Sequence, residues 1–284
     1  MIQRIATPSG TKAVLEKYDL YAKKNYGQNF LVECGIVEKI ARHAVISDHC
    51  AVIEIGPGIG ALTQYLCEYA QKVIAFEIDQ RLEPVLNDNL SDYDNFTLVM
   101  EDFLTVDLKK YVNPLYEAGL DVVVAANLPY YITTPILFRL FEYGDDIKAI
   151  TVMMQKEVAD RFSAETNAKD YNALSVITQY RCEVQRVCKV PANVFQPKPK
   201  VDSAVLQFRF RTDTPLIDEA AFFELVKECF RQRRKTILNN YGEYLGNKEK
   251  AGEILTKAEI LPTARAQSLE LSDFVRLYEV QYER

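Results

Sequence analysis

A glycine-rich turn from Gly56 to Gly60 is the stretch of this sequence best suited to hold a nucleotide. The apolar run 51–53 before it predicts a strand, and the run that begins at Leu62 predicts a helix. A strand, a glycine-rich turn and a helix open the nucleotide-binding half of a doubly wound sheet. Because glycine has no Cβ, its backbone can approach a ligand closely. A dinucleotide and S-adenosylmethionine can both use such a turn.

Two acidic residues stand near the ends of the next two predicted strands. Glu77 lies in the strand-like run 72–79, 21 positions after Gly56. An acid at about 20 positions from the first glycine is where such folds bind ribose hydroxyls, because one carboxylate accepts two hydroxyl donors. Asp102 follows the run 96–100, at the edge where open α/β sheets bind ligands. Both acids are therefore candidate cofactor contacts.

A polar turn, Asn127-Leu128-Pro129-Tyr130, follows the apolar run 122–126. The side-chain carbonyl of Asn127 and the backbone carbonyl of Leu128 can accept hydrogen bonds from one exocyclic amino group, while Pro129 holds the turn open. The ring of Tyr130 can stack on the base that carries this amine. The four residues together predict a clamp for a planar amine.

Such a clamp favours methyl transfer to N6 of adenine. Two carbonyl acceptors favour a more tetrahedral nitrogen and direct its lone pair at an electrophile, such as the sulfonium methyl of S-adenosylmethionine. The transfer is an in-line displacement that depends mainly on positioning and electrostatics. It needs no strong base before attack, which suits a chain whose only histidines, His43 and His49, lie outside these motifs.

A nicotinamide oxidoreductase is an alternative, because the turn also fits the G-x-G-x-x-G/A dinucleotide pattern. The sequence offers no evident hydride-relay residue for that chemistry. The polar turn after the run 122–126 therefore favours the methyltransferase.

Length and composition predict a cytoplasmic protein with one large and one smaller domain. The chain has 284 residues, and its apolar runs are far shorter than the ~20 residues of a membrane span. A net charge of −6 argues against nucleic-acid binding by the whole surface but permits local basic patches. The six cysteines form no C-x-x-C pair, so we expect buried thiols and no metal site.

Strand and helix patterns alternate through most of the chain, which predicts an α/β fold with a mainly parallel sheet. Further strands are expected at 149–154, 184–190 and 203–210, and helices at 11–18, 33–45, 81–89, 135–141, 155–162 and 172–180. The sheet pattern stops after Arg211, and the tail predicts helices at 219–230, 234–241, 248–255 and 273–282, the last capped by Ser272. We expect an N-terminal extension at 1–22, a nucleotide-binding domain at 23–211 and a helical domain at 212–284.

Several motifs, in this order, resemble the ribosomal RNA adenine dimethyltransferases. They are the stretches 26–31, 54–63, 127–130, 194–204 and, in the helical tail, 230–240. The last stretch is similar to the branch of the family that acts on small-subunit RNA and whose loss gives kasugamycin resistance. The resemblance runs from about Lys23 to near the C-terminus.

The resemblance implies a Rossmann-like class I methyltransferase sheet that uses S-adenosylmethionine, followed by a small all-helical domain. It implies that two adjacent adenosines in the hairpin loop near the 3′ end of 16S ribosomal RNA are each dimethylated. The substrate would be a nearly assembled small (30S) subunit, with a role in late subunit biogenesis. We expect a monomer.

The resemblance also implies roles for individual residues. The target base is clamped by a catalytic set consisting of Asn127, Leu128, Pro129 and Tyr130, with Phe195 on its other face. The cofactor set consists of Gln28, Asn29, Leu31, Gly56, Gly58, Glu77, Ile78, Asp102, Phe103 and Asn127. Basic residues beside the motifs are expected to contact RNA phosphates, namely Lys23, Lys24, Lys198, Lys200, Arg231, Arg233, Arg234 and Lys235.

Two further interpretations stay open. A 23S ribosomal RNA methyltransferase of the macrolide-resistance kind would share the catalytic domain, but its relatives lack a motif like Arg231–Lys235. A mainly non-catalytic assembly factor would bind immature subunits without needing the clamp. The intact Asn127 and Glu77 count against that interpretation.

Overall fold

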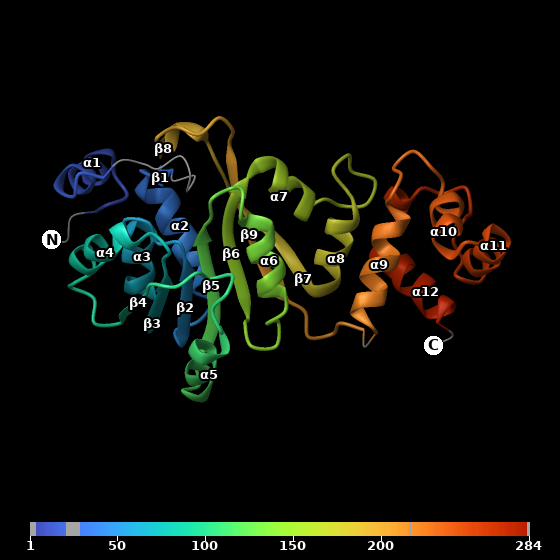
Figure 1. Cartoon of the computed structure of the whole chain (residues 1–284), viewed down its shortest axis with the longest axis horizontal. Coiled ribbons are helices and arrows are strands. Elements are labelled where there is room, and N and C mark those ends of the chain that lie inside the picture. Colours follow the sequence, from blue (N-terminus) through green and yellow to red (C-terminus); the bar gives the residue numbers. More distant parts are fainter. Residues whose placement is uncertain (1–3, 21–28, 216, 283–284) are drawn as a thin grey trace. The chain divides into compact units, whose positions relative to one another are not determined.

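The computed structural model describes residues 4–20, 29–215 and 217–282 (Figure 1). The expected site residues Lys23, Lys24 and Gln28 lie outside these ranges. The chain forms two compact units. The first comprises the residues up to Ala159 together with Gln185–Phe210, and the second comprises Asp160–Val184 and the residues from Arg211 onward.

A seven-stranded sheet organises the first unit, with the strand order β4-β3-β2-β5-β6-β9-β7. The pairs from β4 through β6 are parallel, and β9 runs antiparallel to β6, so the prediction of a mainly parallel sheet is confirmed. A second, two-stranded sheet pairs β1 with β8. The strands are β1 (Phe30–Leu31), β2 (Cys50–Ile55), β3 (Lys72–Phe76), β4 (Phe96–Val99), β5 (Asp121–Asn127), β6 (Ala149–Gln155), β7 (Cys182–Val190), β8 (Phe195–Gln196) and β9 (Ser203–Phe210).

Helices connect these strands, as the alternating pattern predicts. Two elements carry the chain between the units, because α7 (Lys156–Phe162) leaves the first unit and β7 returns to it. The other helices of the first unit are α1 (Pro8–Lys17), α2 (Cys34–Ala44), α3 (Ala61–Tyr69), α4 (Glu83–Asn89), α5 (Lys109–Glu117), α6 (Thr133–Phe141) and the short helices η2 (Gln80–Leu82) and η3 (Ala192–Val194).

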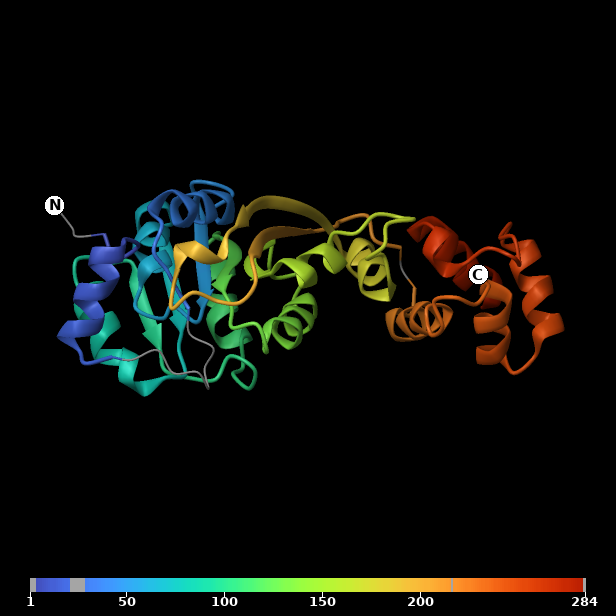
Figure 2. The same ribbon diagram turned by 90° about the horizontal axis from the view of Figure 1, so that it is seen from above.

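Helices α2 and α6 cover opposite faces of the sheet (Figure 2). Ile40 of α2 belongs to the same buried cluster as Met153 and Val205 of the sheet. On the other face, the ring of Phe141 of α6 packs edge-on against Phe208, with 5.9 Å between ring centroids. Neighbouring residues of a strand point to opposite faces, so β9 supplies core side chains to both layers. The sheet is thus buried on both faces, and this packing holds its strands in place.

The described part of the N-terminal extension packs on the first unit. The N–H of Ile5 donates to Oε1 of Gln64 on α3 at 3.0 Å, and Arg4 forms an ion pair with Glu68 at 2.6 Å. Ile5 is buried in the same cluster as Ile59 of the glycine-rich turn. The extension therefore supports the core behind that turn.

A core of aromatic and aliphatic side chains holds the second unit together. The ring of Tyr180 lies 4.9 Å from the ring of Phe222, and its hydroxyl donates to the carbonyl of Pro215 at 2.7 Å.

Within the described ranges, no helix is both long and apolar enough to span a membrane. The helices of the second unit are α8 (Ala173–Arg181), α9 (Glu219–Cys229), α10 (Ile237–Leu245), α11 (Lys248–Lys257), α12 (Leu271–Gln281) and the short η4 (Ala266–Ser268).

The structure differs from the sequence expectations in one segment of the domain division. Residues 160–184 were expected in the domain of the sheet, but they belong to the second unit. The physical reason is that the apolar side chains Val176, Ile177 and Tyr180 of α8 are buried in the core that α9 and α12 supply. Helical spacing identifies a buried face but not the element that covers it.

Some local elements also differ from the expectations. Helix α5 was not predicted, and the proline inside it, Pro114, is the residue that opposes a helix there. Helix α10 begins at Ile237 rather than at 234, so the preceding basic residues lie in a loop. Helix α12 begins at Leu271, because Glu270 and Asp273 cap it reciprocally in place of Ser272.

Candidate functional site

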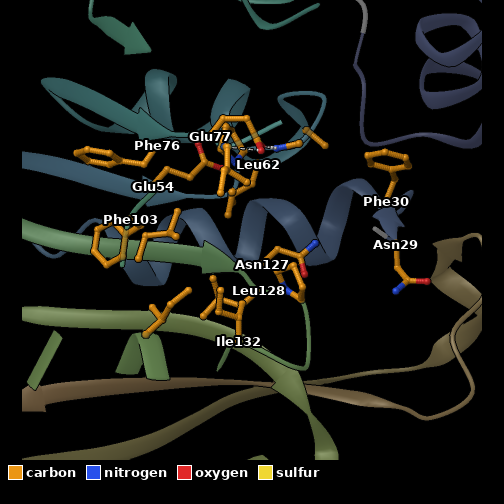
Figure 3. A pocket seen from close by; sticks show the side chains of 18 of the residues that line it. Asn29, Phe30, Glu54, Leu62, Phe76, Glu77, Phe103, Asn127, Leu128 and Ile132 are labelled. Carbon is orange, nitrogen blue, oxygen red and sulfur yellow. Dashed lines mark hydrogen bonds between the residues drawn. The ribbon is translucent and has the colours of Figure 1, made fainter. Parts of the chain in front are cut away.

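One open pocket lies at the carboxyl ends of the parallel strands (Figure 3). Every described residue of the expected cofactor set and of the expected catalytic set lines it. In Figure 3, Glu54 and Glu77 lie on one side of this space, and Asn127 and Leu128 lie on another. Lys198, Lys200 and the basic residues of the tail are not among the lining residues. The structure therefore brings two of the three predicted sets together.

The glycine-rich turn has a backbone that only glycine adopts readily. The φ angles of Gly56, Gly58 and Gly60 are 68°, 60° and 90°, all in the left-handed region. The N–H of Gly60 donates to the carbonyl of Pro57 at 3.0 Å and closes the turn just before α3. Among the residues that the structure describes, a Cβ on Gly56 would meet no atom within 4 Å. The space beside Gly56 is thus open for a ligand to approach the backbone.

Glu77 is held by three backbone N–H groups. Its Oε1 accepts hydrogen bonds from Ile78 at 2.8 Å and Asp79 at 2.9 Å, and its Oε2 accepts one from Gly58 at 3.3 Å. Burial raises the pKa of Glu77, whose exposed fraction is 6%, and the three N–H groups oppose that rise. A carboxylate has about four lone-pair sites and these N–H groups occupy three of them, so about one site remains for a hydroxyl donor.

Glu54 is a second acid in the pocket wall, and no sequence motif predicts a role for it. Its exposed fraction is 1%, and its Oε2 has no hydrogen-bond partner among the described residues. Burial raises the pKa of Glu54 to about 8, so the carboxyl group is mostly neutral at pH 7. The sequence signal for Glu54 is that it is the one charged residue in the otherwise apolar strand β2.

The loop after β4 presents Asp102 and Phe103 to the pocket. Oδ1 of Asp102 accepts the N–H of Leu104 at 2.9 Å, and the ring of Phe103 packs edge-on against Phe76 at 5.5 Å. Arg139 of α6 donates to two backbone carbonyls of this loop. The contact of Phe103 with Phe76 and the hydrogen bonds from Arg139 therefore hold the loop in the position that faces the pocket.

The turn after β5 is closed by the start of α6. The carbonyl of Pro129 accepts the N–H of Ile132 at 3.1 Å and the hydroxyl of Thr133 at 3.2 Å. The hydroxyl of Tyr130 forms a hydrogen bond with that of Ser203 at 2.9 Å. Burial raises the pKa of Tyr130, so its hydroxyl stays protonated at neutral pH. The turn is thus a fixed structure rather than a free loop.

Phe195 reaches the pocket through the small two-stranded sheet. The pairing of β1 with β8 sets Phe195 opposite Leu31, and the N–H of Val32 donates to the carbonyl of Val194 at 2.9 Å. This pairing joins two motifs that lie far apart in the sequence. Tyr131, which no sequence motif predicts as a site residue, also lines the pocket and is 64% exposed.

The basic residues of the tail form an exposed loop after α9. The side-chain amide of Asn240 shapes this loop by donating to the carbonyls of Cys229 at 2.7 Å and Gln232 at 3.1 Å. Arg231 pairs with Glu228 and Lys235 with Glu243, each at 3.4 Å. Arg233 donates to the carbonyl of Lys169. These exposed pairs are weak, so the cations can exchange partners at little cost.

Comparison with known proteins gives one family and relatives of nearly the same length. Residues 20–282 match the family model described as ribosomal RNA adenine dimethylase. The chain is 47% identical over 287 residues to the ribosomal RNA small subunit methyltransferase A of Bacillus pumilus (strain SAFR-032). That match covers 99% of this chain and 98% of the relative.

Two solved structures are similar over most of their length. A dimethyladenosine transferase from Plasmodium falciparum is 28% identical with a TM-score of 0.72, covering 86% of this chain and 94% of that one. The 23S rRNA methyltransferase ErmE is also 28% identical, with a TM-score of 0.71, covering 89% and 99%. These similarities confirm the α/β methyltransferase fold predicted from the sequence.

Proposed function

The chain belongs to the ribosomal RNA adenine dimethylase family, and from this we propose that it transfers methyl groups from S-adenosylmethionine to N6 of two adjacent adenosines. Each adenosine receives two methyl groups, and both lie in the hairpin loop near the 3′ end of 16S ribosomal RNA. One observation carries the proposal at the site, namely that the glycine-rich turn, Glu77 and the Asn127–Tyr130 turn line a single pocket. A nucleoside cofactor and a base amine can therefore meet in one space.

The lining residues fit S-adenosylmethionine. The open space beside Gly56 admits a ligand to the backbone, and Glu77 offers acceptor oxygens for ribose hydroxyls. Asp102 and Phe103 supply a polar and an aromatic contact for the adenine. Oε2 of Glu54, which has no hydrogen-bond partner among the described residues, would accept a hydrogen bond from the ammonium group at the methionine end. When bound, the cofactor supplies an electrophilic methyl group on a sulfonium.

The turn after β5 would hold the target adenine. The side chain of Asn127 and the carbonyl of Leu128 accept from the N6 amino group, which directs its lone pair toward the methyl group. Tyr130 stacks on one face of the base, and Phe195 lies on the other. This nitrogen would accept the methyl group of the cofactor, and the methylated amine would then release one proton.

The proposed partner is 16S ribosomal RNA within the small ribosomal subunit. The loop from Arg231 to Lys235 would contact phosphates, as would Lys198 and Lys200 beside Phe195. A base in a hairpin loop is unstacked more cheaply than a base in a helix, which suits a pocket that must receive a flipped adenine.

The alternatives weighed from the sequence are less well supported. The nicotinamide oxidoreductase is wrong, because the chain belongs to a methyltransferase family. The relative that matches over nearly its whole length is named for the small subunit, which favours 16S over 23S ribosomal RNA as the substrate. The intact pocket does not favour a mainly non-catalytic assembly factor.

Labelled S-adenosylmethionine with purified 30S and 50S particles tests the proposal. The particles should come from a strain that lacks this activity, so that the target adenines are unmodified. We expect label in the 30S particles only, mapped to two adjacent adenines as N6,N6-dimethyladenosine. Label confined to the 50S particles would show that the large subunit is the substrate.

A further inference from the structure

Tyr130 and Phe195, the two aromatic residues of the proposed base clamp, are tied to one dipeptide at the start of β9. The hydroxyl of Ser203 bonds the hydroxyl of Tyr130 at 2.9 Å. The adjacent carboxylate of Asp202 accepts the N–H of Ala192 at 2.9 Å, in the short helix that leads directly into Phe195. Neither Asp202 nor Ser203 lines the pocket.

The sheet places this dipeptide where it can reach both aromatic residues. Ser203 stands opposite Gln155 at the end of β6, and Asn127 ends β5 opposite Met153. Ser203 is therefore beside the edge from which the Asn127–Tyr130 turn begins. The carbonyl of Asp202 also accepts the N–H of Lys156 at 2.9 Å, which fixes the dipeptide to the end of β6.

Burial makes the serine hydroxyl a constrained partner. The exposed fraction of Ser203 is 0%, whereas Tyr130 is half-buried and lines the pocket. A buried hydroxyl that loses its partner is costly, so the bond resists rotation of the tyrosine ring away from its position. Asp202, in contrast, is exposed and acts through a backbone N–H.

We propose that Asp202 and Ser203 are positioning residues that set the gap between Tyr130 and Phe195, and so the geometry in which the target base is held. Ser203 fixes the ring of Tyr130, and Asp202 fixes the turn that carries Phe195. The inference depends on the proposed function, because it assigns these residues to the clamp of that reaction.

The test is a double-mutant cycle of Ser203→Ala and Tyr130→Phe, measured as single-turnover methyl transfer to 30S particles at saturating cofactor. Each variant removes one end of the same hydrogen bond. We expect each single variant to slow transfer by about 3- to 10-fold, and the double variant to be no slower than either. The affinity for S-adenosylhomocysteine and for the 30S particle should be unchanged, since the bond orients a bound base.

A matched control is Ser47→Ala, which removes a hydroxyl that donates to Asp121 at 2.7 Å at the opposite edge of the sheet. It should leave the transfer rate unchanged. Asp202→Ala should also slow methyl transfer. In a Phe195→Leu background this slowing should be smaller, because Asp202 acts through the turn that carries Phe195.

Independent effects of Ser203→Ala and Tyr130→Phe that multiply in the double variant would overturn the positioning role. Loss of cofactor affinity in Ser203→Ala would overturn it as well, since this would indicate general damage to the pocket. Wild-type transfer is measured first in the same assay, so its absence would contradict the proposed function instead.

Discussion

The carboxylate of Glu77 accepts the backbone N–H of Gly58 at 3.3 Å, which ties the end of β3 to the glycine-rich turn after β2. The two strands are parallel neighbours in the sheet, so their carboxyl ends lie side by side. The acid thus fixes the turn while it presents acceptor oxygens to the pocket. The glycine-rich turn and the acceptor for the cofactor's hydroxyl groups therefore both depend on the side chain of Glu77.

Replacing Glu77 by Gln should weaken binding of S-adenosylhomocysteine by about 10- to 100-fold, because charge-assisted hydrogen bonds are lost. The amide also puts a donor against backbone N–H groups that now donate to Glu77. Isothermal titration calorimetry measures this affinity. Glu117→Gln, which removes an exposed acid on α5, is the control and should bind normally. Equal affinities for the two variants would remove Glu77 from the site.

Replacing Gly56 by Ala should reduce cofactor affinity by more than its cost in stability explains. A Cβ at Gly56 meets no atom of the described residues within 4 Å and would occupy pocket space. Gly119 has a similar φ of 74° and the same open surroundings, but it lies outside the pocket lining. Both substitutions should cost about 1–2 kcal/mol of stability through left-handed strain. Only Gly56→Ala should impair binding, and comparable binding losses in both would assign the effect to strain alone.

The buried carboxyl of Glu54 should make stability depend on pH. Its folded-state pKa, raised to about 8 by burial, lies above the ordinary value of 4.5. The folded state therefore binds a proton that the unfolded state releases, so this contribution is complete below pH 4.5 and is lost as pH rises through 8. Relative to Glu54→Gln, the wild type should lose about 1.4 kcal/mol per pH unit across that window. Denaturant unfolding of both proteins without ligand measures this difference, and parallel pH curves would contradict it.

Neutralising Arg234 and Lys235 should weaken binding to 30S particles and make it less sensitive to salt. Each lost phosphate contact should reduce the slope of log K against log salt by about 0.7–0.9. The loss should be greatest at low salt, where electrostatic attraction is strongest. Filter binding across a salt series measures the slope. The paired variant Lys248→Gln and Lys250→Gln, on α11 of the same unit, should behave like wild type; an equal change there would mean that only net charge matters.

Much of the site could be predicted because its residues follow strands directly. Glu77, Asp102 and Asn127 each stand at or just after the end of a parallel strand, and parallel strands end at a common edge. Glu54 received no role, since its position inside a strand predicts only that it is buried. The contact between Tyr130 and Ser203 depends on the antiparallel register of β9 against β6, which no local pattern specifies.

The division of the chain into two units could not be fully predicted from the sequence either. The apolar face of α8 has ordinary helical spacing, and nothing in that spacing distinguishes a sheet from α9 as its partner. The start of α10 depends on Asn240, which folds back on the carbonyls of Cys229 and Gln232. Such contacts arise only when separate elements pack together.

We propose above all that Asn127 holds the amino group of a flipped adenine for transfer. The most direct test is single-turnover methylation of 30S particles by wild type and Asn127→Ala, at cofactor concentrations that saturate both proteins. We expect two adjacent dimethylated adenines with the wild type and none with the variant, while binding to the particle is retained. Undiminished dimethylation of the same adenines by Asn127→Ala would contradict it.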